Sequence, residues 1–311
     1  MLPNFFIVGA PKAGSTSLYN FLDEHPQVFM SPIKEPCYFS PEVRTENFAE
    51  RYQRYPVRQR ADLKEYLRHS VREKRFGCIV SEWEDYLSLF DRAAHQQAVG
   101  EASVCYLHSP TAARNIALRI PNARIIIVLR DPAERAYSQY LHTVANGYER
   151  RPFREHINAS LVSKKQMFGP LYPFLECGMY YEQVARYMAH FPRENILICF
   201  YQDGHAGILA DIFRFLKLGP LEMNISRKDL DRTTARQATV LYGMLRKYDL
   251  LGAFRKWTPA AVRPALQRLA YRNRKPPAMD EDDRHFLRDY YHDDVVKLAA
   301  LLNRDLSSWI A

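Results

Sequence analysis

Cysteines are few in this chain of 311 residues, and long apolar stretches are missing. The five cysteines are scattered and odd in number, which argues against a disulfide framework and favours reduced thiols. No stretch approaches the ~18 uninterrupted apolar residues of a transmembrane helix, so we expect no membrane span. Internal repeats, low-complexity tracts and metal-ligand spacings are also missing. These absences exclude disulfide-rich, membrane-spanning and repeat proteins, and they indicate an ordinary globular protein.

The charge balance is the first positive signal. Forty-four Lys and Arg residues against 35 Asp and Glu give a formal net charge of +9. This excess of positive charge is expected for a solvated basic surface, and it is also expected for a protein that attracts a multiply anionic ligand. No nucleic-acid reader motif is present, so we expect no nucleic-acid partner. With 47% hydrophobic and 25% charged residues over this length, one large α/β domain is the expectation, with two allowed.

The strongest local signal lies near the amino terminus. The apolar run at 5–8 is typical of a buried strand, residues 9–14 form a small-residue turn, and a Ser/Thr cluster at 15–17 opens an apolar-periodic helix. Backbone N–H groups at such a helix start converge on an anion, and the helix dipole adds to the attraction. Gly14 lets the backbone approach the anion closely. The segment therefore predicts a phosphate-binding loop.

This loop departs from that of nucleoside triphosphate-binding proteins in one place. The pattern G-x-x-x-x-G-K-[ST] would start at Gly9 and place a lysine directly after Gly14. Ser15 occupies that position, and the lysine of this loop is Lys12. A P-loop kinase or phosphotransferase is therefore an alternative that Ser15 disfavours. A non-catalytic nucleotide-binding module is a second alternative.

A further anion-binding segment is predicted around Arg130. The run Ile125–Leu129 is typical of a central parallel strand that is buried on both faces. Asp131 suits the N-cap of a following helix, whose first position is a proline. Arg130 then lies between a strand end and a helix start, where its guanidinium can grip a phosphate or, alternatively, pair with a carboxylate. Ser138, two helical turns later, presents a hydroxyl to the same region.

Both segments resemble one protein family. Residues 11–18 (PKAGSTSL) are similar to the 5′-phosphosulfate loop of sulfotransferases that use 3′-phosphoadenosine 5′-phosphosulfate (PAPS), in the branch of the heparan sulfate N- and O-sulfotransferases and bacterial relatives. Residues 124–140 resemble the segment that binds the 3′-phosphate, through Arg130 and Ser138. The resemblance covers residues 4–220 well and the rest loosely. It implies an α/β fold with a P-loop-type central parallel β-sheet flanked by helices, the PAPS sulfotransferase fold, in a single domain over 1–311.

The resemblance also implies the cofactor and the residues that hold it. PAPS is expected as the sulfuryl donor, giving PAP, with no metal required. In the carboxyl-terminal helical part, residues 222–311, Arg232 or Arg236 falls where relatives close a loop over the cofactor. The 5′-phosphosulfate loop, residues 9–18, is expected to bind through Lys12, Ala13, Gly14, Ser15, Thr16 and Ser17.

Two residues carry the expected chemistry. Sulfuryl transfer needs a cation near the leaving oxygen, for which Lys12 is the natural group. It also needs a base, and Glu35 in the KEPCYF stretch occupies the position of the family's catalytic glutamate. An ion pair with Lys34 or with an arginine is the alternative for Glu35, and His108 is a rival base. Cys37 stands where relatives often have histidine.

The acceptor is less well defined by the sequence. Glu101, His108 and Tyr180 are candidate acceptor-binding residues, with a structural role open for Glu101 and packing open for Tyr180. Basic and aromatic loops at 40–60 and 147–177 suit a carbohydrate or small-molecule acceptor, an anionic one included, that offers a hydroxyl or an amine. A strand that starts near the amino terminus leaves no room for a secretory signal, so we expect a cytoplasmic enzyme of bacterial type.

The alternation of strands and helices indicates a parallel sheet with crossover connections. Strands are expected at 5–8, 27–30, 98–102, 124–129 and 196–200. Helices are expected at 61–75, 180–190 and 211–218, and a final helix at 282–302 after the Pro276–Pro277 break.

Overall fold

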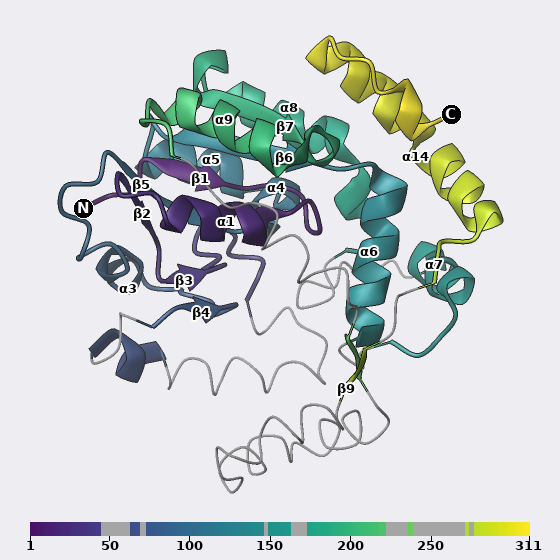
Figure 1. Ribbon diagram of the computed structural model, residues 1–311, viewed down its shortest axis with the longest axis horizontal. Coiled ribbons are helices and arrows are strands. Elements are labelled where there is room, and N and C mark those ends of the chain that lie inside the picture. The colour runs from purple at the N-terminus through teal and green to yellow at the C-terminus, as the bar shows by residue number, and fades with distance from the viewer. Residues whose placement is uncertain are drawn as a thin grey trace, which may run out of the picture.

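A five-stranded parallel sheet forms the centre of the molecule (Figure 1). The structure, a computed structural model, describes residues 1–44, 63–68, 73–145, 149–162, 173–221, 236–238, 271–273 and 277–311. Its strand order is β2-β5-β1-β6-β7, and every neighbouring pair runs parallel. This confirms the predicted α/β fold with a central parallel sheet. The strand bounds are β1 Phe5–Ile7, β2 Val28–Met30, β5 Ala98–Ala102, β6 Arg124–Leu129 and β7 Ile196–Phe200.

Strand β6 illustrates why this sheet forms. All side chains from Ile125 to Leu129 are fully buried, and most of them are β-branched, which suits a strand covered on both faces. Strand β1 lies between β5 and β6, so the chain passes from one side of β1 to the other between these two strands. In parallel α/β sheets ligands bind at the carboxyl ends of the strands beside such a crossing point.

Helices cover the sheet and extend beyond it on one flank. Helix α1 packs against β2 and β5, α9 packs against β7, and α8 contacts α4, α5 and α14. In Figure 1, α6 and α14 stand to the right of the sheet, and the short strands β3 and β4 lie below it. The helix bounds are α1 Ser15–Asp23, α3 Trp83–Ser88, α4 Cys105–His108, α5 Ala112–Arg119, α6 Pro132–Ala145, α7 Phe153–Val162, α8 Tyr180–His190, α9 Gly204–Leu216 and α14 Glu281–Leu302.

Short elements complete the described part of the chain. Strands β3 and β4 form a parallel pair, and β8 and β9 form an antiparallel pair. Their bounds are β3 Ile33–Lys34, β4 Arg75–Phe76, β8 Arg236–Ala238 and β9 Tyr271–Asn273. Single 3-10 turns are η2 Glu176–Gly178, η3 Arg193–Asn195, η4 Tyr201–Asp203 and η5 Ser307–Trp309.

Three predicted helices have different limits in the structure. Residues 63–68 are helical, but Arg75 belongs to β4, where its guanidinium lies 4.1 Å from the centre of the Tyr66 ring. The helix expected at 211–218 begins earlier, at Gly204, because its buried apolar positions start at Ile208. The final helix starts one residue before the prediction. Most of the part 222–276 lies outside the described residues.

Helix α6 connects the sheet to the carboxyl-terminal helix α14. The Asp131 carboxylate accepts hydrogen bonds from the N–H groups of Ala133 (2.8 Å) and Glu134 (3.1 Å), so the predicted N-cap is confirmed. The Glu134 carboxylate in turn pairs with Arg284 of α14. Further along α14, Asp294 accepts hydrogen bonds from the first N–H groups of α8. These contacts hold α14 against α6 and α8.

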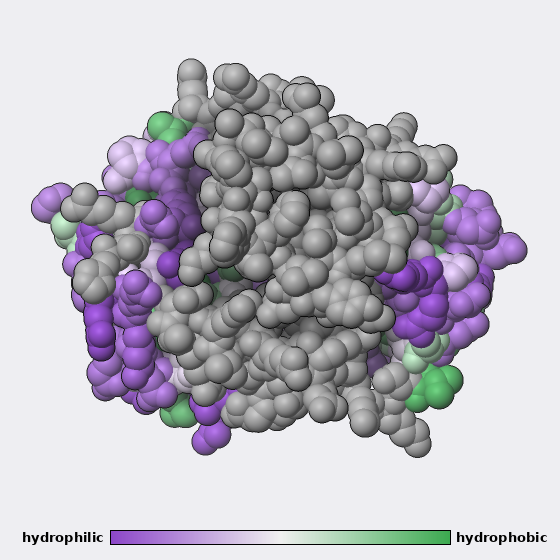
Figure 2. Space-filling model, turned by 90° about the horizontal axis from the view of Figure 1, so that it is seen from below, coloured by the Kyte–Doolittle hydropathy of each residue, from purple (hydrophilic) through white to green (hydrophobic). Residues whose placement is uncertain are grey.

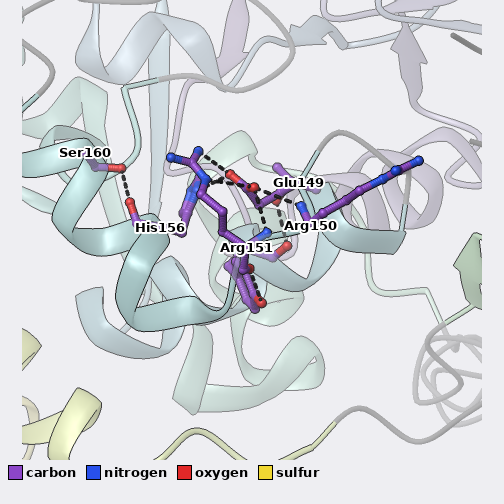
Figure 3. Close-up of polar contacts among 7 residues, drawn as sticks. Glu149, Arg150, Arg151, His156 and Ser160 are labelled. Carbon is purple, nitrogen blue, oxygen red and sulfur yellow. Dashed lines mark hydrogen bonds and ion pairs between the residues drawn. The ribbon is translucent and has the colours of Figure 1, made fainter.

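A polar cluster lies at residues 149–151 and the first turns of α7 (Figure 3). The Glu149 carboxylate accepts hydrogen bonds from the backbone N–H groups of Arg150 and Arg151. The Arg151 guanidinium and the His156 ring donate to the same carboxylate, with Nη2–Oε2 and Nδ1–Oε2 distances of 2.6 Å. Burial acts to raise the pKa of Glu149, but these donors outweigh it and lower the pKa to about 2. The Arg150 side chain points away from the cluster in Figure 3.

The described surface is mainly hydrophilic on the face that Figure 2 shows. Seen from below, the described residues at both sides of the molecule carry mostly hydrophilic side chains, with scattered hydrophobic ones. Of the described helices, none has both the length and the apolar character that crossing a bilayer requires. The five cysteines are all buried, and none of them forms a disulfide.

Candidate active site

The carboxyl ends of the five parallel strands bring the candidate residues to one edge of the sheet. Loop 8–14 follows β1, Glu35 comes shortly after β2, and Ser103 follows β5. Arg130 follows β6, and Tyr201 follows β7. The loop, Glu35 and Arg130 were predicted from the sequence, whereas Ser103 and Tyr201 were not. Strand ends of a parallel sheet share one edge, so all five positions belong to a single region.

The loop after β1 has the backbone of an anion site. A Cβ on Gly9 would lie 2.7 Å from the backbone nitrogen of Val128, so only glycine allows this approach to β6. Lys12 (φ 68°) and Gly14 (φ 88°) are both left-handed, which is the turn geometry of N–H-lined concavities. Gly14 is the N-cap of α1 and provides no side-chain cap. In this turn the Ala13 N–H donates to the Ala10 carbonyl oxygen at 3.2 Å, and the Ser17 N–H donates to the Gly14 carbonyl oxygen at 2.9 Å. The N–H groups of Gly14, Ser15 and Thr16 lie between these two donors, at the opening of α1, where an anion can bind.

The loop residues predicted to hold a phosphosulfate alternate in exposure. The side chains of Ala13, Ser15 and Ser17 are buried, whereas Lys12, Gly14 and Thr16 are half-buried. The half-buried residues therefore form the accessible surface of the loop.

Arg130 lies in contact with this loop. Its Nη1 donates to the Lys12 carbonyl oxygen at 3.1 Å, and its guanidinium lies 4.7 Å from the centre of the Tyr201 ring. Arg130 also forms the ion pair with a carboxylate that the sequence left open. This pair is weak, because Arg130 Nη2 lies 3.7 Å from the half-exposed Glu134 carboxylate. The Arg130 carbonyl oxygen accepts a hydrogen bond from the Tyr180 hydroxyl at 2.9 Å. The two predicted anion-binding segments thus meet at Arg130.

Tyr201 is a residue of this region that the sequence analysis missed. The register of β6 against β7 pairs Leu129 with Phe200, so the residues that follow, Arg130 and Tyr201, lie side by side. A Cβ on Gly14 would lie 3.3 Å from the Tyr201 ring, so the ring flanks the loop. The only signal available in the sequence was position, since Tyr201 directly follows a predicted strand as Arg130 does.

Two further predicted site residues, Ser138 for the 3′-phosphate and Tyr180 for the acceptor, lie on helices. Ser138 is half-buried on α6, two turns after Arg130. Tyr180 is fully buried at the start of α8, and burial raises the pKa of its hydroxyl. Because that hydroxyl donates to the Arg130 carbonyl oxygen, Tyr180 packs behind the Arg130 backbone.

Glu35 has an unusual backbone and a charged partner. Its φ is 65°, and its N–H donates to the Ala102 carbonyl oxygen of β5 at 2.9 Å. Lys34 Nζ lies 2.6 Å from Glu35 Oε1; the Lys34 side chain is 2% exposed and that of Glu35 is 24% exposed. The ion pair that the sequence left as an alternative is therefore formed. It favours an ionised carboxylate, which is also the form that a general base requires.

Glu101 is enclosed in the core and hydrogen-bonded by three hydroxyl groups. Its carboxylate accepts from Tyr86 (2.8 Å), Ser103 (2.8 Å) and Tyr106 (2.9 Å), and the residue has no exposed surface. Burial raises the pKa of Glu101 to about 7, against the opposing effect of these hydrogen bonds. Its described contacts are therefore with the protein interior.

His108 ends α4 and lies beside two cationic side chains. Burial, together with the positive charges of Arg186 and Arg135, lowers its pKa to about 3. Its Nδ1 lies 3.5 Å from the Cys177 sulfur. An imidazole with so low a pKa is neutral at pH 7 and accepts a proton poorly, which favours Glu35 of the two rival bases.

The last two predicted cofactor residues belong to the carboxyl-terminal part of the chain. Arg232 lies outside the described residues, and Arg236 is the first residue of β8, whose backbone pairs with Asn273 of β9. Across the described ranges, no group of three or more His, Cys, Asp or Glu residues is arranged to hold a metal ion.

Known proteins resemble this chain over most of its length. Human carbohydrate sulfotransferase 15 is 29% identical over 273 residues, covering 71% of this chain and 44% of that protein. The human bifunctional heparan sulfate N-deacetylase/N-sulfotransferase 3 is 26% identical over 324 residues, covering 99% of this chain and 31% of that protein. The chain thus spans less than half the length of these relatives.

A solved structure and a family model agree with these relatives. A sulfotransferase from Alicyclobacillus acidocaldarius superposes with a TM-score of 0.70 at 27% identity, covering 100% of both chains. The fold therefore has a counterpart that matches over its whole length. The model of the Sulfotransferase family matches residues 3–199, which include β1 through most of β7 with the intervening loops. This chain belongs to the sulfotransferase family.

Proposed function

We propose that this protein transfers the sulfuryl group of PAPS to a hydroxyl or amine of a carbohydrate acceptor. The observation that carries the proposal is the hydrogen bond between Arg130 Nη1 and the Lys12 carbonyl oxygen, at 3.1 Å. It joins the two segments that the sequence predicts to bind anions, through residues that are 118 positions apart in the chain. PAPS is a nucleotide with a phosphate at each end, and a pair of neighbouring anion sites suits such a molecule.

The residues at the sheet edge fit this nucleotide. The opening of α1 lacks a side-chain cap, which suits a bound anion in the place of the cap. We assign the 3′-phosphate to Arg130 and Ser138, and closure over the nucleotide to Arg232 or Arg236. The 5′-phosphosulfate is assigned to the loop residues Lys12, Ala13, Gly14, Ser15, Thr16 and Ser17.

Lys12 and Glu35 would divide the chemistry between them. PAPS, when bound, supplies a sulfuryl group attached to a phosphate that can leave. The Lys12 ammonium would offset the negative charge that grows on the leaving phosphate oxygen. The Glu35 carboxylate would take the proton from the acceptor oxygen or nitrogen as it attacks, and its ion pair with Lys34 favours the ionised form before the reaction. Both residues act through position and charge.

A carbohydrate is the acceptor class that the relatives support. The two human proteins described above are named for sulfation of carbohydrate and of heparan sulfate. The net charge of +9 is compatible with an anionic saccharide. Whether the product carries sulfate on oxygen or on nitrogen is an outcome of the experiment below. The cytoplasmic location expected from the sequence stays a prediction.

Transfer of label from PAPS tests the proposal directly. The protein is incubated with ³⁵S-labelled PAPS and a panel of acceptors that includes desulfated heparan sulfate and simple saccharides. We expect labelled carbohydrate and released PAP, in the presence of a metal chelator as well as without it. A protein that binds PAP but labels no acceptor would be a non-catalytic nucleotide-binding module. Phosphorylation from ATP that a chelator abolishes, with no reaction of PAPS, would establish the kinase alternative.

A further inference from the structure

The loop that carries Glu35 has a backbone that its own sequence does not favour. Glu35 (φ 65°) and Cys37 (φ 54°) are both left-handed, and neither is a glycine. Side chains with a Cβ disfavour this region, so neighbouring structure must hold the loop in place. The first such contact is the hydrogen bond from Glu35 N–H to the Ala102 carbonyl oxygen.

Two hydroxyl groups hold the next part of this loop. The N–H of Cys37 donates to Ser103 Oγ at 3.3 Å, and the N–H of Phe39 donates to the Tyr106 hydroxyl oxygen at 3.3 Å. Each hydroxyl in turn donates a hydrogen bond to the same buried carboxylate, that of Glu101. Ser103 donates to Glu101 Oε2 at 2.8 Å, and Tyr106 donates to Glu101 Oε1 at 2.9 Å. Residues 35, 37 and 39 are thus all anchored on β5 and the segment that follows it.

The carboxylate strengthens these anchors. A hydroxyl that donates to a negative charge becomes a better acceptor for a second hydrogen bond, and the effect is greatest where water is excluded. Glu101 and Ser103 have no exposed surface, and Tyr106 is equally buried. In its ionised form, Glu101 therefore acts on two backbone N–H groups that it does not touch.

We infer that Glu101 is a positioning residue for Glu35, acting through the Ser103 and Tyr106 hydroxyls. The inference rests on the proposed role of Glu35 as the base. Small displacements of a reacting group reduce turnover strongly, whereas binding of the nucleotide depends on other residues. Loss of either hydroxyl should therefore lower kcat and leave PAP affinity unchanged.

Tyr86 offers a matched control. Its hydroxyl is the third donor to Glu101, at 2.8 Å to Oε1, and its ring stacks on Tyr38 with a centroid distance of 4.8 Å. Replacing Tyr86 by Phe removes one hydrogen bond to Glu101, as Ser103→Ala and Tyr106→Phe do, and keeps the ring. Both hydroxyls that hold the loop remain in that variant.

The test compares the three variants in the full chain. We expect Ser103→Ala and Tyr106→Phe to lower kcat about ten- to a hundredfold, with the Kd for PAP and the KM for PAPS within about twofold of the wild type. All three substitutions should lower Tm by similar amounts, because each removes one hydrogen bond to Glu101. Tyr86→Phe, however, should leave kcat within about twofold of the wild type. Equal losses of kcat in all three variants, unchanged kcat in Ser103→Ala and Tyr106→Phe, or a parallel loss of PAP affinity would overturn the inference. Failure of the wild type to transfer sulfate from PAPS would instead overturn the proposed function.

Discussion

Replacement of Glu149 by Gln should destabilise the protein in a manner that depends on pH. The carboxylate is 10% exposed and accepts hydrogen bonds from two backbone N–H groups, the Arg151 guanidinium and His156 (Figure 3). These donors lower its pKa from 4.5 to about 2. Each unit is worth about 1.4 kcal/mol, so the ionised carboxylate contributes roughly 3 kcal/mol to the free energy of unfolding at pH 7.

The sign of the pH dependence follows from the direction of this change. Because the folded pKa is the lower one, the unfolded chain takes up a proton first as the pH falls. The contribution is therefore complete above about pH 5.5 and declines progressively from pH 4.5 toward pH 2. Between pH 7 and pH 3.5 the difference between the wild type and Glu149→Gln should shrink by about 1.4 kcal/mol.

Urea denaturation of both proteins across this pH range measures the effect. Glu155→Gln is the matched control, because Glu155 is exposed on α7 and the same chemical change should alter stability by no more than about 0.5 kcal/mol. Equal effects of the two substitutions, or a Glu149→Gln effect that stays constant down to pH 3.5, would refute the reasoning.

Three further predictions concern the sheet edge. Gly9→Ala should lower the free energy of unfolding by about 1–3 kcal/mol, measured by urea denaturation, because the new Cβ would lie 2.7 Å from the Val128 backbone nitrogen. Lys12→Ala should lower kcat about 10²–10³-fold, which corresponds to about 2.7–4 kcal/mol of transition-state stabilisation; near-normal turnover would remove Lys12 from the mechanism. Glu35→Gln should bind PAP with unchanged affinity in calorimetry and lose turnover, and the reverse pattern would assign Glu35 a structural role.

The sheet itself could be predicted well, because its signals are local. The strands at 98–102, 124–129 and 196–200 were predicted with the observed bounds, the last two from runs that are apolar throughout or after the first residue. Asp131 was identified as an N-cap from its own residue type and the proline that follows it. Such features depend on a few consecutive residues, so the sequence alone is sufficient.

Contacts between strands could not be predicted in the same way. Tyr201 lies beside Arg130 because of the register between β6 and β7, and no single segment of sequence contains that information. The chain from Glu101 through Ser103 to Cys37 likewise depends on the pairing of distant segments. Glu149 belongs to a short run of charges that is typical of solvated surface, and only the fold places it against His156.

The central claim is that the loop 9–18 and Arg130 hold opposite ends of one nucleotide. Calorimetric binding of PAP and of adenosine 5′-phosphate, which lacks the 3′-phosphate, to the wild type and to Arg130→Ala tests it most directly. We expect the substitution to weaken PAP binding about tenfold or more, the loss that accompanies a charge-assisted hydrogen bond, and to leave adenosine 5′-phosphate binding nearly unchanged. An equal loss of affinity for both nucleotides, or no loss for either, would contradict the account.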